Sequence, residues 1–163
     1  MVNALPALAV SAQPIKKALR WTYINTRRRA LGFGSLECGE KVDQILKSVN
    51  AQVFLSPLSL LEIRNALNFG INRGEITSDQ RDAVLVEIDA QIEKGFFRLV
   101  DASQSSIYAK AQELSNKHTP ATATRSLDLM HLAAALLPGA RTFLTFDKRQ
   151  AKAATAEGLL VKP

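Results

Sequence analysis

Apolar positions along the chain follow two alternating patterns, one typical of buried strands and one of amphipathic helices. Short β-branched and aromatic runs predict strands at 21–24, 53–55, 96–100, 142–146 and 159–161. Apolar residues at helical spacing predict helices at 40–49, 56–71, 79–94, 103–116, 127–137 and 148–157. Strands therefore alternate with helices through most of the chain. This alternation predicts an α/β fold with a parallel sheet covered on both faces.

Polar residues and helix breakers predict where several of these elements begin and end. Ser78 is the expected cap of the helix at 79–94, and Thr124 and Ser126 are both plausible caps of the helix at 127–137. Residues 118–123 are expected to form a polar loop. Pro138 and Gly139 are expected to end the helix at 127–137. Residues 1–18 carry no clear period and are expected to be a loose leader, followed by one domain over 19–163.

Composition narrows the functional classes. A net charge of +6 favours a polyanionic partner such as nucleic acid. Cys38 is the single cysteine and His118 and His131 are the only histidines, which argues against a disulfide framework and against a zinc enzyme. No apolar run is long enough to span a membrane, and the short apolar run at 4–12 has no Lys or Arg before it, so we expect a cytoplasmic protein.

Three acidic residues stand out because of their apolar neighbours. Asp128 lies in the first turn of a mostly apolar helix, Asp147 directly follows a buried strand, and Glu62 lies in an apolar helix shortly after another strand. Taken singly, an acid in a helix first turn complements the helix dipole, and an acid after a strand is often an N-cap. Because each follows a different strand, however, all three are able to converge at the carboxyl edge of one sheet.

Converging carboxylates have a chemical consequence. Like charges repel, so such a group is stable only with a bound cation or with raised pKa values. Oxygen ligands with few histidines nearby suit Mg²⁺ or Mn²⁺. A site of this kind can activate water and stabilise the leaving oxygen of a phosphodiester.

Three passages carry a resemblance to a known family: SPLSLLEIRNAL, SLDLMHLAAAL and ARTFLTFDKRQAKAATAEGLLV, which contain Glu62, Asp128 and Asp147 respectively. Over about 45–161 the chain resembles PIN-domain ribonucleases, most of all the toxins of VapBC-type toxin–antitoxin pairs. The resemblance implies a three-layer α/β/α domain with a central, mainly parallel sheet. It also implies Mg²⁺- or Mn²⁺-dependent cleavage of RNA, with the three acids as catalytic metal ligands, a cognate antitoxin, and a homodimer.

The N-terminal part departs from the family pattern. Asn25 stands where the family has its first aspartate, and Arg27 stands where a serine belongs. An asparagine oxygen can ligate Mg²⁺ but brings no negative charge, so Asn25 is expected to be a weak ligand at a degenerate position. This departure supports a second hypothesis, a PIN-like protein that binds RNA or an antitoxin without turnover. Phosphoaspartate phosphatases and receiver domains are disfavoured because they need an aspartate at this strand end.

Several further residues are candidates by position. Thr145 matches a position at which the family often has a hydroxyl group. One interpretation is that it positions an acid or a water molecule, and the other is that it is an ordinary β-branched strand residue. His131 shares a helix face with Asp128 and is a candidate to assist a proton transfer or to contact phosphate, although such a histidine is more often a satisfied residue on a helix edge. We expect RNA phosphate contacts from Arg27, Arg64 and Arg149, for which a solvated basic surface is an equal explanation.

Overall fold

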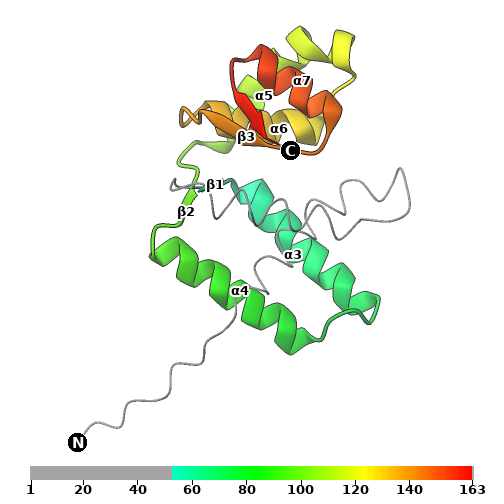
Figure 1. Cartoon of the computed structure of the whole chain (residues 1–163), viewed down its shortest axis with the longest axis vertical. Helices are drawn as coiled ribbons and strands as arrows, with labels where there is room; N and C mark the ends of the chain where they lie inside the picture. Colours follow the sequence, from blue (N-terminus) through cyan, green and yellow to red (C-terminus); the bar gives the residue numbers. More distant parts are fainter. Residues whose placement is uncertain (1–52, 163) are drawn as a thin grey trace, which may run out of the picture.

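The computed structural model describes residues 53–162, in which short strands alternate with helices (Figure 1). The elements are β1 (Val53–Leu55), α3 (Pro57–Asn72), α4 (Ser78–Glu93), β2 (Phe97–Leu99), α5 (Gln104–Thr122), α6 (Ser126–Leu136), β3 (Thr142–Leu144), α7 (Lys148–Ala156) and β4 (Leu160–Lys162). The four strands predicted within this range are confirmed, three of them with slightly shifted or shorter ends. The leader predicted at 1–18, the strand at 21–24 and the helix at 40–49 lie outside the described residues.

The strands pair in parallel, as the alternating pattern predicted. β1 pairs with β2, with Val53 opposite Phe97, and β3 pairs with β4, with Thr142 opposite Leu160. Parallel pairs joined through helices confirm the α/β class and are consistent with the three-layer α/β/α domain. Within residues 53–162 the four strands form two separate pairs rather than one continuous sheet. No helix in this range is both long and apolar enough to cross a membrane.

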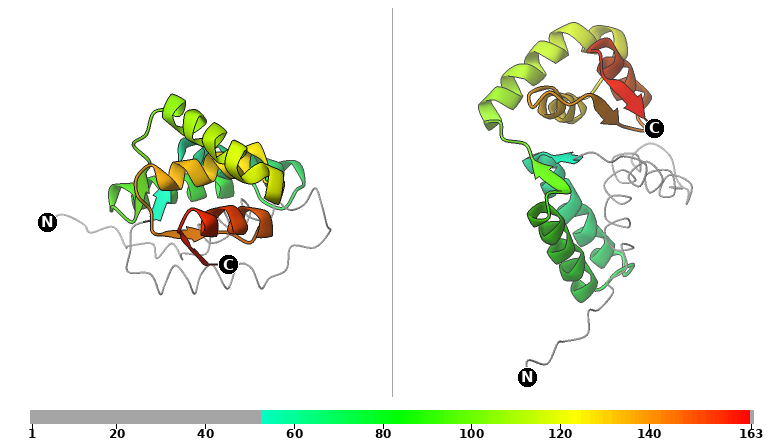
Figure 2. Two further views of the ribbon diagram at one scale, coloured as in Figure 1. Left: turned by 90° about the horizontal axis from the view of Figure 1, so that it is seen from above. Right: turned by 60° about the vertical axis from the view of Figure 1, so that its left-hand side comes forward.

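The first strand pair packs with the hairpin formed by α3 and α4, which lie side by side (Figure 2). Ser56 caps α3 by accepting a hydrogen bond from the Ser59 N–H at 3.1 Å, and Pro57 occupies the first helical position, where its missing N–H costs nothing. The apolar stripes of both helices meet the strands in one buried cluster: Leu55, Ile63, Leu67, Ile76, Val84, Ile88 and Phe97. Removal of this apolar surface from water stabilises the unit.

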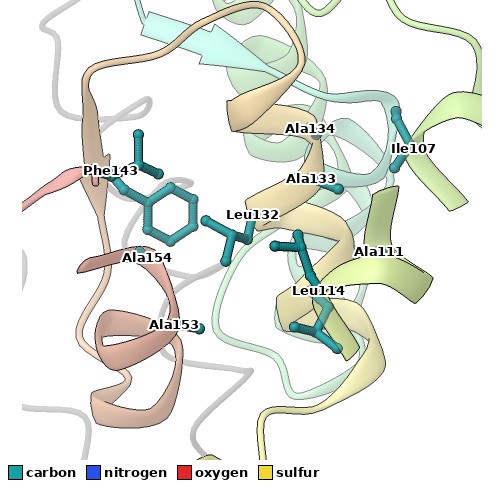
Figure 3. Close-up of a cluster of buried hydrophobic side chains, with 11 residues drawn as sticks. Ile107, Ala111, Leu114, Leu132, Ala133, Ala134, Phe143, Ala153 and Ala154 are labelled. Atoms are coloured by element: carbon teal, nitrogen blue, oxygen red, sulfur yellow. The ribbon is translucent and has the colours of Figure 1, made fainter. Parts of the chain in front are cut away.

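The second strand pair packs with α5, α6 and α7 around a separate core (Figure 3). Leu132 of α6 is fully buried and lies between Phe143 of β3 and the α5 side chains, which include Leu114. Much of the remaining contact is made by small residues of α6 and α7: Ala133, Ala134, Ala153 and Ala154. Small side chains allow the helices to approach closely, so this alanine-rich sequence suits a compact helical layer.

Two predicted helix caps are wrong by one residue. Thr77, and not Ser78, caps α4: its hydroxyl accepts from the Gln80 N–H at 3.2 Å while the Gln80 side chain accepts from the Thr77 N–H at 3.0 Å. At α6 the capping position is Arg125, and neither Thr124 nor Ser126 fills it. The Thr124 hydroxyl is buried and contacts a neighbouring threonine hydroxyl at 2.6 Å, so it is not free to cap the helix.

The polar loop predicted at 118–123 is also wrong, because α5 continues to Thr122. His118 is buried, and its Nε2 lies 2.6 Å from Glu157 Oε1, which also accepts from Lys117 Nζ at 2.7 Å. The Lys117 ammonium, and to a lesser degree His118, holds the pKa of Glu157 below its usual range. This distant carboxylate anchors the end of α5, a contact that local propensity does not reveal.

Candidate functional site

The elements around the two cores form a first unit (β1, β2, α3 and α4) and a second unit (β3, β4, α5, α6 and α7). Asp128 and Asp147 lie at the starts of two helices of the second unit. Asp128 is in the first turn of α6, where its Oδ2 accepts a hydrogen bond from the Arg125 backbone N–H at 3.3 Å. Asp147 caps α7: its Oδ1 accepts from the N–H groups of Arg149 at 2.8 Å and Gln150 at 3.1 Å. The structural roles that are ordinary for such acids are therefore both present.

The two aspartates also interact electrostatically. Burial, and after it the negative charge of Asp147, raises the pKa of Asp128 above its ordinary value. The Arg125 N–H and the charges of His131 and Arg125 act in the opposite direction. A half-buried carboxylate beside a second carboxylate is a place where a cation is bound favourably.

Glu62, in the first unit, contacts His131 of the second unit. Its Oε2 lies 2.8 Å from His131 Nε2, and both side chains are 19% exposed. Glu62 belongs to α3 and His131 to α6, one turn after Asp128, so this pair joins the two units beside the aspartates. The contact with Glu62 satisfies the His131 ring, in agreement with the more ordinary of the two roles considered for this histidine.

The contacts described above engage one carboxylate oxygen of each acid: Asp128 Oδ2, Asp147 Oδ1 and Glu62 Oε2. The structure brings Asp128 near Asp147 and Glu62 to His131. Over the same range, no three His, Cys, Asp or Glu side chains lie close enough together to form a metal site. The donor chemistry nevertheless fits a hard divalent cation, since it consists of carboxylate oxygens of which two already repel each other.

Thr145 and Gln150 form a buried polar link beside these acids, with 4% and 7% exposure. The Thr145 hydroxyl accepts from the Asp147 N–H at 3.1 Å and donates to Gln150 Oε1 at 2.6 Å. The Gln150 Nε2 donates to the Asp128 carbonyl at 3.1 Å. Sequence reasoning missed Gln150, for which the available signal was a polar side chain three residues after a helix cap, among buried alanines.

Two of the three candidate basic residues, Arg64 and Arg149, lie within the described part of the chain. Arg149 is exposed, and its Nη1 donates to the Ala123 carbonyl at 3.4 Å. Arg64 is exposed on α3, two residues after Glu62. Both are therefore accessible to an anionic partner. Asn25 and Arg27 lie outside the described residues.

Comparison with known proteins identifies a family. The PIN domain model matches residues 36–156, which is well over half of the chain and includes all three acids and Gln150. No curated protein and no solved structure gives a significant match.

Proposed function

Because the chain belongs to the PIN domain family, whose members are generally nucleases, we propose that it is a metal-dependent endoribonuclease that hydrolyses RNA phosphodiesters. The family also generally uses divalent metal ions. The observation that carries the proposal is the pair of neighbouring carboxylates Asp128 and Asp147, where burial and mutual repulsion favour a cation.

Mg²⁺ or Mn²⁺ would be held by Asp128 and Asp147, with Glu62 as a third ligand and Asn25 as a weaker one. When bound, such an ion supplies an activated water and stabilises the leaving oxygen of the scissile phosphodiester. The support for these ligands is their oxygen chemistry and their match to the three family-like passages. Asn25 adds no charge, so the affinity for the ion is expected to be lower than with a fourth carboxylate.

The protein's own residues would hold the acids and attract the substrate. The backbone N–H groups at the start of α7 hold one oxygen of Asp147, and the other oxygen would bind the ion. His131 restrains Glu62 at the same edge. Arg64 and Arg149, together with Arg27, would attract RNA phosphates by charge.

The motif resemblance extends the proposal to biological context. We propose a cytoplasmic toxin of the VapBC type, paired with an antitoxin and acting as a homodimer. The support is the order and spacing of the passages around Glu62, Asp128 and Asp147. A test of this context is co-expression of a candidate antitoxin, which should relieve growth inhibition caused by this chain.

Cleavage of a panel of structured RNAs with Mg²⁺ or Mn²⁺ tests the enzymatic proposal. The parent chain should cut, and Asp128→Asn should not. Asp79→Asn is the matched control, because Asp79 lies in the first turn of α4 and is exposed away from the site. Cleavage only by an Asn25→Asp variant would show a disabled nuclease, and equal cleavage by parent and Asp128→Asn would refute the assigned site.

A further inference from the structure

Gln150 connects the two aspartates through a continuous set of hydrogen bonds. The Asp147 N–H donates to Thr145 Oγ1, the Thr145 hydroxyl donates to Gln150 Oε1, and Gln150 Nε2 donates to the Asp128 carbonyl. These contacts join the end of β3, the first turn of α7 and the first turn of α6. We propose that Gln150 is a positioning residue that sets the spacing of the Asp128 and Asp147 carboxylates for a divalent cation, an inference that rests on the proposed function.

The direction of each hydrogen bond fixes how the Gln150 amide lies. The Asp128 carbonyl only accepts, so the amide nitrogen must face it and the amide oxygen must face Thr145. Rotating the amide would place two carbonyl oxygens against each other. Because both ends of the buried side chain are engaged, Gln150 holds one defined orientation.

The position of Gln150 makes this arrangement unusual. It is the third residue of α7, where a glutamine commonly turns back to the N–H of the capping residue, as Gln80 does toward Thr77 at α4. At α7 the N–H of the cap Asp147 is taken by Thr145 instead. Gln150 is thereby free to reach α6, which an ordinary helix start does not require.

Electrostatic repulsion between Asp128 and Asp147 explains why a contact between their helices matters. Asp128 lies in the first turn of α6 and Asp147 caps α7, the helix that Gln150 joins to α6, so the two carboxylates repel when both are ionised. Besides the alanine packing between α6 and α7, the Gln150 contact holds the first turns of these helices at a fixed separation against this repulsion. A restraint between the residues that carry metal ligands commonly governs metal affinity, and its removal lowers that affinity by about 10- to 100-fold.

Mn²⁺ affinity, measured by calorimetry and by the spin-resonance spectrum of the bound ion, tests the inference on the full chain. Gln150→Met keeps the side-chain length but removes the amide, and it should weaken Mn²⁺ binding about 10- to 100-fold and broaden the spectrum. Gln91→Met is the matched control, since Gln91 of α4 donates to Glu87 at 2.8 Å, away from the acids. This control should bind Mn²⁺ like the parent chain.

Thr145 provides a second measurement in case Gln150→Met fails to fold. Thr145→Val removes the hydroxyl and should weaken Mn²⁺ binding, whereas Thr145→Ser retains it and should restore binding. Adding Gln150→Met to Thr145→Val should then have little further effect, because both act on one set of contacts.

The possible failures are distinguishable. A folded Gln150→Met variant with parental Mn²⁺ affinity would overturn the positioning role and leave the proposed metal site standing. Equal Mn²⁺ affinity of Thr145→Val and Thr145→Ser would also overturn the positioning role and leave the proposed metal site standing. A parent chain that binds no Mn²⁺ would overturn both the positioning role and the proposed function.

Discussion

Asparagine and alanine at position 147 should separate the structural contact of Asp147 from its charge. The Oδ1 atom of Asp147 accepts hydrogen bonds from two backbone N–H groups at the start of α7, at 2.8 and 3.1 Å. An asparagine oxygen caps a helix about as well, so Asp147→Asn should change the free energy of unfolding by less than about 0.5 kcal/mol. Asp147→Ala loses both contacts and should cost about 1 kcal/mol, equivalent to about 2–4 °C in melting temperature at this chain length.

The same substitutions should change the titration of Asp128. Burial is the largest cause of its raised pKa and the Asp147 charge is a smaller one. Both variants should therefore lower the Asp128 pKa while leaving it above the ordinary value. Because a raised folded pKa means that the folded state holds its proton longer, the stability of the metal-free parent should fall as pH rises through the interval between the ordinary and the raised value. This loss should be smaller in Asp147→Asn.

Urea denaturation and carboxyl-detected NMR titration of the metal-free protein measure both effects. If Asp147→Asn destabilised the fold as much as Asp147→Ala, the cap would not be the structural role of this residue. If the Asp128 pKa were unchanged in both variants, the two carboxylates would not interact, and the argument for a cation between them would fail.

Three further predictions concern the fold and use urea denaturation as the measurement. Glu157→Gln should cost about 1.5 kcal/mol in free energy of unfolding at neutral pH. Because the pKa of Glu157 is lowered in the folded state, the stabilisation by its charge is present above the unfolded pKa and is lost as pH falls through the folded pKa. An equal cost of the substitution at low pH would contradict this role of Glu157. Thr77→Ala should cost about 1 kcal/mol while Ser78→Ala stays near neutral, and the reverse order would reject the assigned cap. Leu132→Ala should cost about 2–5 kcal/mol, against less than about 0.5 kcal/mol for Leu127→Ala, which is half exposed; similar costs would contradict the described core.

Local sequence was sufficient for the strands and for most of each helix. Short β-branched runs such as 53–55 have few alternatives, and the apolar stripes of α3 and α4 have helical spacing. Helix ends were less predictable because the choice between neighbouring candidates depends on geometry, as at Thr77 and Ser78. α5 continues through Pro120, and near its end His118 contacts Glu157, almost 40 residues away along the chain, a contact that local sequence does not predict.

The candidate site was predictable to a similar extent. The sequence predicted that Asp128 and Asp147 converge because each follows a different strand of a parallel sheet. In the structure the charge of Asp147 acts on Asp128. The contact between Glu62 and His131 joins residues from different units, and no periodicity encodes it. Gln150 escaped notice because its importance depends on Thr145 taking the N–H that a capping glutamine usually binds.

Anomalous diffraction from a crystal soaked in Mn²⁺ would show whether Asp128 and Asp147 hold a divalent ion, because it locates the ion without reference to activity. We expect one anomalous peak in contact with the carboxylates of Asp128 and Asp147, with Glu62 directed toward it, and loss of that peak in Asp128→Asn. A peak away from both aspartates, or none at an Mn²⁺ concentration that supports RNA cleavage, would contradict the proposed metal site.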